Sequence, residues 1–180
     1  MNEISNDQSA WNGKPLDEVL AYLLRTHHPY TKRALEELMP LLDKVVRVHG
    51  EAHPELGELR ALFISLRDDL QLHLMKEENI LFPFIAALGS GAPVPAPPFG
   101  SVANPIRMMR GEHEADSEIL HRMRAITNGF AAPDGACGSY VALYAGMREL
   151  VDDLMRHIWL ENNVLFPRAI ECEGDASGRA

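Results

Sequence analysis

The sequence predicts an all-α protein, an up-down four-helix bundle built from two related helical hairpins. Four long stretches carry apolar residues at alternating spacings of four and three, which is the seam of a helix bundle. Turns rich in glycine and proline separate these stretches, and the alternating pattern of a β-strand is scarce. A motif in the second stretch returns in the fourth, 84 residues later, from His73 to His157. Two copies of one helical hairpin are the simplest architecture that accounts for this repeat.

The composition suits one soluble domain. The chain has 180 residues, of which 46% are hydrophobic, enough for one sizeable core. Its formal net charge of −9 argues against nucleic acid and anionic membranes as partners, because both attract basic surfaces. Cys137 and Cys172 form neither a close pair nor a zinc-binding spacing, and no apolar run is long enough to cross a membrane. We therefore expect a cytoplasmic protein with no disulfide framework and no signal peptide.

The first helix is expected over residues 16–49, after a polar segment, 1–15, that we expect to be disordered or loosely packed. Pro29 and Pro40 should each kink or restart this helix, because proline removes a backbone hydrogen bond. Gly50 suits the end of the helix. At 4-3 spacing, its inward residues are Leu24, His28, Thr31, Leu35, Leu38, Leu42, Val45 and His49.

The second helix is expected to begin at Pro54 and to run to about Leu88, followed by a long loop over 89–105. The same spacing gives its inward residues as Leu59, Phe63, Leu66, Leu70, His73, Glu77, Ile80 and Phe84. The prolines of the two repeats, Pro83 and Pro167, should each kink the chain there.

The third helix is expected to begin near Pro105, with Asn104 as its N-cap, and to end near residues 128–129. Ser139 is the expected cap of the fourth helix, whose inward residues are Leu143, Met147, Leu150, Leu154, His157, Glu161 and Val164. These four helices assign residues 16–170 to one bundle and leave 171–180 as a flexible tail.

The repeated motif carries potential metal ligands. It reads histidine, three residues, glutamate, one residue, asparagine, one residue and Leu-Phe-Pro, and it places His73 with Glu77 and His157 with Glu161. Residues four apart lie one above the other on one face of a helix, so each copy presents an imidazole and a carboxylate together. A weaker repeat, at an offset of 85 residues, relates 25–28 to 110–113.

Six ligand-type residues therefore point into the predicted core: His28, His73, Glu77, His113, His157 and Glu161. Burying them without partners would cost several kcal/mol per charge, and cations would offset that cost. Nitrogen and carboxylate ligands without thiolate favour iron or manganese over structural zinc. The number of ligands suits two metal ions bridged by both glutamates and an oxo or hydroxo group, with open positions for small molecules. The alternative is a set of core histidines hydrogen-bonded to glutamates.

These motifs resemble the hemerythrin-like fold and, within it, the di-iron family named for the repair of iron centres. The similarity covers about residues 16–170. Its most specific parts are Lys44-Val-Val-Arg-Val-His49, the two repeated motifs, Glu112-His113-Glu114, Ala136-Cys137 and the stretch from Asp152 to Arg168. The resemblance implies that the six residues above hold two non-haem iron ions, with Glu77 and Glu161 as bridges.

The resemblance also implies a function under nitrosative or oxidative stress. That function is the repair of iron–sulfur centres by iron donation, or by binding and reduction of nitric oxide. Its partners would be nitric oxide, dioxygen, damaged iron–sulfur proteins and an electron donor. The alternative is a sensor or carrier of dioxygen or nitric oxide without turnover, so enzymatic activity stays open. Iron storage is disfavoured because the two Glu-x-x-His pairs of ferritin-like bundles are not both present, and a purely structural bundle is the remaining class.

The chain departs from its resemblance in two ways. Oxygen-carrying hemerythrins have a further histidine where Ser117 stands, and their last ligand follows the helix-4 histidine by five residues, whereas Glu161 follows His157 by four. Both differences argue against simple oxygen carriage. Members of the repair family usually carry a small N-terminal domain with a cysteine motif, and residues 1–15 contain no cysteine.

Several residues near the ligands have two interpretations. Asp69 and Asp153 precede ligand histidines by four residues and could orient an imidazole, although solvated acids are the default. Glu78 and Glu112 adjoin ligands and could help iron to reach the site, again with a solvated face as the default. We expect His27 and His121 on the surface, His49 at a helix C-terminus where the dipole favours it, and Cys137 as a structural or idle thiol.

Overall fold

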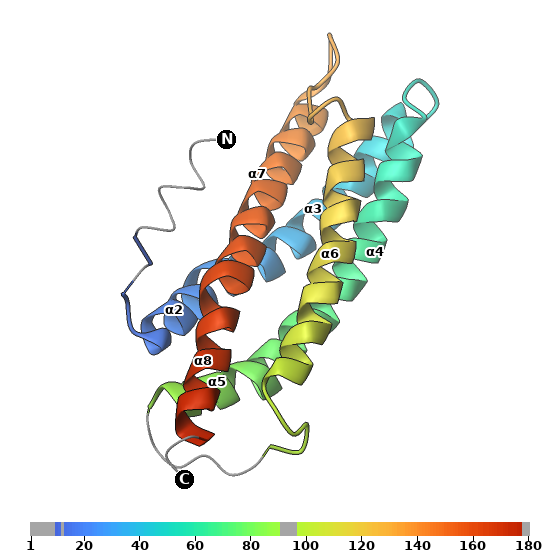
Figure 1. Cartoon of the computed structure of the whole chain (residues 1–180). Helices are drawn as coiled ribbons and strands as arrows, with labels where there is room; N and C mark the ends of the chain where they lie inside the picture. Colours follow the sequence, from blue (N-terminus) through green and yellow to red (C-terminus); the bar gives the residue numbers. More distant parts are fainter. Residues whose placement is uncertain (1–9, 12, 91–96, 178–180) are drawn as a thin grey trace.

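The computed structural model describes residues 10–11, 13–90 and 97–177, and within these ranges the regular structure is entirely helical. The long helices of the described chain are α3 (His28–His49), α4 (Glu55–Lys76), α6 (Ala103–Ile126) and α7 (Gly138–Leu160). They run alternately up and down, with α3 packed against α4 and α7, and α4 against α6 (Figure 1). The predicted up-down four-helix bundle is thereby confirmed. None of the described helices is both long and apolar enough to span a membrane.

Shorter helices close the lower end of the bundle: α2 (Leu16–Tyr22), α5 (Phe82–Gly89) and α8 (Phe166–Ser177) (Figure 1). Each is joined to a long helix by a π-helical turn, namely η1 (Leu23–His27), η2 (Glu77–Leu81) and η3 (Glu161–Leu165). In each π turn a backbone N–H donates to the carbonyl five residues earlier. These bonds run from His28 to Leu23, from Phe82 to Glu77 and from Phe166 to Glu161.

A proline explains the position of each π turn. Pro29, Pro83 and Pro167 each stand two residues after the end of a π turn, in the first turn of the helix that follows. Proline lacks an N–H and its ring clashes with the carbonyl four residues before it, so the regular α-helical ladder must open there. The widened turn keeps the helix continuous instead of breaking it. Pro40 differs, because α3 runs through it without a break.

The π turns change which residues face the core. A π turn inserts one extra residue, so a 4-3 count that runs across it comes out on the wrong face. Leu24 and Ile80 were predicted to be buried, but they are 39% and 53% exposed. Leu23 and Leu81, their neighbours, are buried in their place. The other inward predictions for the first helix, from His28 to Val45, are confirmed as buried.

Two predicted caps, Asn104 and Ser139, were wrong. Helix α6 begins at Ala103, so Asn104 lies inside it and its side-chain amide donates to the Phe99 carbonyl. The backbone N–H of Val102 instead donates to Glu173 Oε1 of α8, at 2.8 Å. Helix α7 begins at Gly138, and Ser139 makes no capping bond there, because its hydroxyl accepts a hydrogen bond from Lys44 Nζ.

The ends of the chain are more structured than expected where they are described. Residues 171–177 are helical, so a flexible tail from residue 171 is wrong for this part, and the bond from Val102 to Glu173 explains why. Near the N-terminus, Trp11 packs on Tyr22 with ring centroids 4.7 Å apart. Residues 1–9 and 178–180 lie outside the described ranges.

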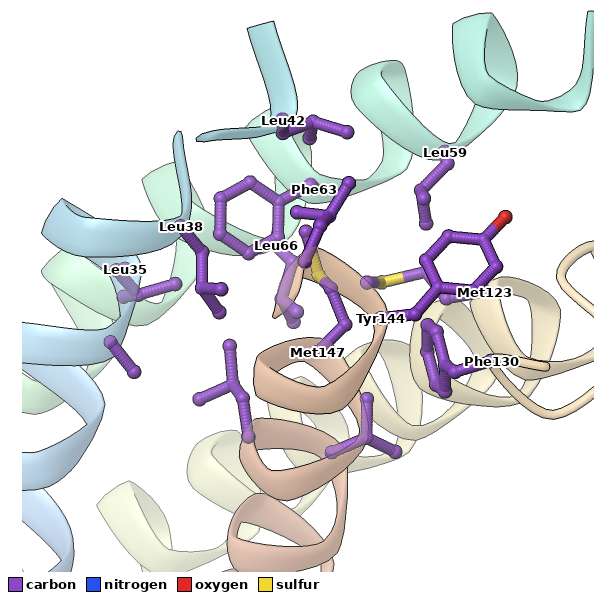
Figure 2. Close-up of a cluster of buried hydrophobic side chains, with 14 of the residues drawn as sticks. Leu35, Leu38, Leu42, Leu59, Phe63, Leu66, Met123, Phe130, Tyr144 and Met147 are labelled. Atoms are coloured by element: carbon purple, nitrogen blue, oxygen red, sulfur yellow. The ribbon is translucent and has the colours of Figure 1, made fainter. Parts of the chain in front are cut away.

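The core has two apolar clusters with a polar layer between them. The upper cluster is centred on Phe63 of α4, which is fully buried among side chains of the other long helices (Figure 2). The lower cluster joins the short helices to the start of α6, and includes Leu23, Phe82, Ile106 and Phe166. The predicted metal ligands belong to neither cluster, because they occupy the level between the two.

We expect Phe63→Ala to lower the free energy of unfolding by about 3–5 kcal/mol, because it opens a cavity in the upper cluster. The matched change Val48→Ala, at a side chain that is 63% exposed, should cost less than about 1 kcal/mol. Urea unfolding followed by circular dichroism measures both. Equal losses in the two variants would contradict this assignment of the core.

Candidate metal centre

The six predicted ligand residues meet at one level of the bundle. Six helical elements supply one residue each, and each of the six residues is at most 2% exposed. They form two groups of four, in which the ligand atoms of each group lie within 4.8 Å of one another: His28, Glu77, His157 and Glu161, and His73, Glu77, His113 and Glu161. Both glutamates belong to both groups. The structure therefore offers two adjacent cation positions with two shared carboxylates.

The shared carboxylates each lie between imidazoles of different groups. Glu77 Oε2 is 3.5 Å from His28 Nε2, and Glu77 Oε1 is 3.3 Å from His73 Nε2. Glu161 Oε1 is 2.9 Å from His157 Nε2, and Glu161 Oε2 is 3.2 Å from His113 Nε2. One oxygen of each glutamate thus faces each position, as a bridging carboxylate requires.

The π turns set the positions of three ligands. Glu77 is the first residue of η2, Glu161 is the first residue of η3, and His28 follows η1 directly. The repeated asparagine makes the same hydrogen bond in both copies of the motif, from its side-chain amide to the carbonyl four residues earlier. Asn79 donates to the Met75 carbonyl and Asn163 to the Trp159 carbonyl, both at 2.8 Å.

The phenylalanine of each repeated motif covers a histidine from another helix. The Phe82 ring lies 5.3 Å from the His28 ring, and the Phe166 ring is stacked on His113 at 5.8 Å. Both phenylalanines are buried, so they shield the ligand layer from water at its lower side. Low access of water strengthens the electrostatic interactions inside the site.

The electrostatics of the protein without a cation show how strained this cluster is. Burial and the charge of Glu161 raise the pKa of Glu77. Burial acts in the same direction on Glu161, but His157 and His113 outweigh it and hold the pKa of this carboxyl well below its usual range. Two adjacent carboxylates cannot both ionise freely in an apolar site. One positive charge or more is needed beside them.

The pKa values of two histidines of the site, His28 and His73, are shifted in opposite directions. Burial and the neighbouring His157 lower the pKa of His28 to about 4, so this imidazole is neutral and free to ligate. Burial would also lower the pKa of His73, but the carboxylates of Glu77, Glu161 and Glu112 outweigh it and raise this pKa to about 10. A cation must therefore displace a proton from His73, so its binding should release protons.

The unpaired atoms of the site fit a metal. His28 Nε2, both oxygens of Glu77 and Glu161 Oε2 are buried without a hydrogen-bond partner in the described chain. Buried polar groups are normally paired, and an unpaired one costs about 1–3 kcal/mol. All four atoms face the ligand layer, where a cation would pair them together. Histidine nitrogen and carboxylate oxygen suit iron or manganese.

Three ligand histidines are oriented through their second nitrogen. His28 Nδ1 is 2.9 Å from Glu78 Oε1, His73 Nδ1 is 2.8 Å from Glu112 Oε2, and His113 Nδ1 is 3.1 Å from Asn162 Oδ1. Such partners fix the tautomer that leaves Nε2 free for a metal. The default reading of Glu78 and Glu112 as solvated acids was therefore wrong.

Each of the two carboxylates that orient a histidine, Glu78 and Glu112, also contacts a lysine. Lys32 Nζ lies 2.7 Å from Glu78, and Lys76 forms an ion pair with Glu112. Both carboxylates are about 30% exposed, so they connect the buried ligands with the surface. Charge spacing along one helix could not reveal these pairs, because each of them joins two helices.

His27 was expected on the surface but is buried, at 4% exposed. Its ring is stacked on the ligand His157, 5.3 Å between centroids, and its Nδ1 lies 3.0 Å from Asp153. Asp153 therefore serves His27 and not the ligand that follows it by four residues. The π turn explains the burial, because it brings His27 to the inner face next to His28. His121 is exposed, as predicted.

Asp116 is a buried acid that the sequence argument did not single out. It is 3% exposed, and burial raises its pKa to about 6, with Asp69 and Glu112 adding to the rise and His73 and His113 opposing it. Asp69 is exposed, as expected for a solvated acid. A cavity of about 290 Å³ runs beside His73 and is lined by Asp69, Leu72, Lys76, Glu112, Ala115 and Asp116.

Ser117 occupies the position of an additional histidine in oxygen carriers, and it does not reach the site. Its hydroxyl donates to the His113 carbonyl at 2.6 Å. His49 and Cys137 lie outside the ligand groups, at the opposite end of the long helices. Neither of them contacts the ligand layer.

The comparisons with known proteins agree with this geometry. Residues 19–169 match the family described as the hemerythrin HHE cation binding domain. The chain is 39% identical to the iron-sulfur cluster repair protein DnrN of Neisseria gonorrhoeae, over 92% of this chain and 98% of that protein. It is 42% identical to the iron-sulfur cluster repair protein YtfE of Edwardsiella ictaluri, over 89% and 68% of the two chains. For YtfE of Pectobacterium atrosepticum the values are 38%, 93% and 72%. The chain therefore belongs to the hemerythrin HHE cation-binding family and, within it, to the group of the iron–sulfur cluster repair proteins.

Proposed function

We propose that this protein holds two non-haem iron ions between Glu77 and Glu161 and donates iron to damaged iron–sulfur proteins in the cytoplasm. The observation that carries the proposal is the pair of four-residue groups that share both carboxylates. The names of the relatives supply the iron–sulfur proteins as the recipients. When bound, such an iron pair supplies redox chemistry and open positions for nitric oxide or dioxygen. Turnover of nitric oxide would need an electron donor as a further partner.

The ligand set supports exchange of iron as well as retention. Six protein side chains are few for two six-coordinate ions, even when both glutamates bridge. The site is therefore less closed than a structural metal site, which surrounds its ion with protein ligands.

The cavity beside His73 supports a route between the site and the surface. Its lining runs from the exposed Leu72 to the buried His73 and includes three acids, Asp69, Glu112 and Asp116. An acidic lining attracts cations, and Glu112 bonds directly to the ligand His73. Lys76, which also lines the cavity, forms an ion pair with Glu112.

Anaerobic reconstitution with ferrous iron tests the proposal. We expect about two iron ions per chain and, on mixing with an iron-depleted iron–sulfur enzyme, faster recovery of that enzyme than with equal free iron. Glu77→Ala should lose most of the iron and the recovery, because it removes a ligand from both groups. The exposed Glu149→Ala is the matched control and should behave as the wild type.

Loaded protein that gives no more recovery than free iron would contradict iron donation. Addition of nitric oxide separates the alternative function. A stable nitrosyl spectrum, with all iron retained and no recovery of the enzyme, would show a carrier or sensor without turnover.

We expect Glu112→Gln to weaken iron binding by about 10–100-fold, because it removes the charged partner that orients His73. Glu114→Gln, two residues along the same helix at an exposed position, should leave the affinity unchanged. Competition with a chromogenic chelator measures both dissociation constants. Equal affinities in these two variants would show that Glu112 has no part in holding the metal.

A further inference from the structure

A cysteine and a histidine meet at the end of the bundle opposite the metal centre. Cys137 immediately precedes α7, and His49 is the last residue of α3. His49 Nε2 lies 3.2 Å from Cys137 Sγ, within hydrogen-bond reach for sulfur. The two residues, which we call the thiol–imidazole pair, come from different helices and are 88 positions apart in the chain. A nucleophile and a base at this distance are the elements of an activated thiol.

The surrounding side chains hold the imidazole in place. The His49 ring packs on the ring of Tyr140 at 5.3 Å, and His53 packs on the same ring at 5.5 Å. Tyr140 is itself 1% exposed, and its hydroxyl lies 3.3 Å from that of Tyr144. The imidazole therefore packs against a buried aromatic ring, which favours the orientation that faces Cys137.

The metal centre does not account for the thiol–imidazole pair. His49 follows His28 by 21 residues on the same helix, which is about 30 Å at about 1.5 Å per residue. Neither residue belongs to a potential cation group among the described residues. The Cys137 side chain is exposed, so reagents in solution can reach it.

The environment also indicates what would react there. Lys44 Nζ donates to Ser139 Oγ at 2.9 Å, so a positive charge lies at the first turn of α7, two residues along the chain from Cys137. That charge favours a reagent with carboxylates. Cys172, the other cysteine, lies in α8 at the far end of the bundle (Figure 1) and cannot resolve an adduct on Cys137.

We propose that the thiol–imidazole pair is a thiol–disulfide exchange site, which takes anionic low-molecular-weight disulfides and retains one half as a mixed disulfide on Cys137. His49 Nε2 accepts the thiol proton while Sγ attacks one sulfur of the incoming disulfide. A new S–S bond forms as the old one breaks, so Cys137 is oxidised and the departing half is reduced. The departing thiolate takes the proton from His49 and leaves as a thiol.

The test uses the full-length, iron-loaded protein and glutathione disulfide. Peptide mass spectrometry follows the adduct on both cysteines over time, and Cys172 in the same sample is the reference. We expect Cys137 to react faster, and His49→Gln to slow Cys137 alone by about tenfold or more. His121→Gln, at another exposed histidine, is the matched control and should leave the rate unchanged.

An unchanged Cys137 rate in His49→Gln would overturn the proposal, as would the absence of an adduct on Cys137. A second measurement needs no variant. In urea-unfolded wild-type protein, the advantage of Cys137 over Cys172 should disappear, because the imidazole is no longer beside the thiol. An advantage that persists on unfolding would also contradict the proposal. The iron content should stay constant in all variants, so these outcomes are independent of the function of the metal centre.

Discussion

The structure depends on the encounter of two fully buried carboxylates, Glu77 and Glu161, at the centre of a helix bundle. Burial and the charge of Glu161 raise the pKa of Glu77, while His157 and His113 hold the pKa of Glu161 down. Such an arrangement is unfavourable in a protein core unless positive charge compensates it. The four surrounding histidines and the cations they can hold supply that charge. The two apolar clusters above and below then keep water away.

Each position of the repeated motif has a physical function in building this centre. The histidine and glutamate belong to the groups that could hold a cation, the asparagine donates to a backbone carbonyl, and the phenylalanine covers a histidine from another helix. The proline forces a π turn, which sets the first glutamate of that turn toward the ligand layer. Two copies of one short motif thus supply four of the six residues of a symmetric site.

The sequence was sufficient to predict the fold and the six side chains that meet in the buried polar layer, because their signals are local. His73 with Glu77 and His157 with Glu161 lie four residues apart on the apolar stripe, and the repeat supports the pairing. The misplaced residues follow from features that regular spacing does not contain. Leu24 and Ile80 failed because a π turn adds one residue to the count. The same extra residue brings His27 inside.

Partners from distant parts of the chain were beyond prediction from spacing. In the sequence, Glu112 has the pattern of a solvated acid. Its bond to His73 exists only because α4 and α6 pack together. In the sequence, Glu173 belongs to an expected tail. In the structure, it accepts a hydrogen bond from Val102 because α8 packs near the start of α6. The thiol–imidazole pair likewise joins two helix ends that are remote in sequence. In each case both residues are present in the sequence, but tertiary packing decides that they pair with one another.

The most direct test of the central claim is equilibrium urea unfolding of the protein with and without bound iron, at one pH and one protein concentration. If cations compensate the buried carboxylates, removal of the metal by a chelator should lower the free energy of unfolding by several kcal/mol. The buried Glu77 carboxyl of the iron-free protein should by itself add stability as the pH falls through its raised pKa, because the folded chain takes up this proton before the unfolded chain does. Equal unfolding midpoints for the loaded and the chelated protein would contradict the account, since they would show that the cluster is stable without a cation.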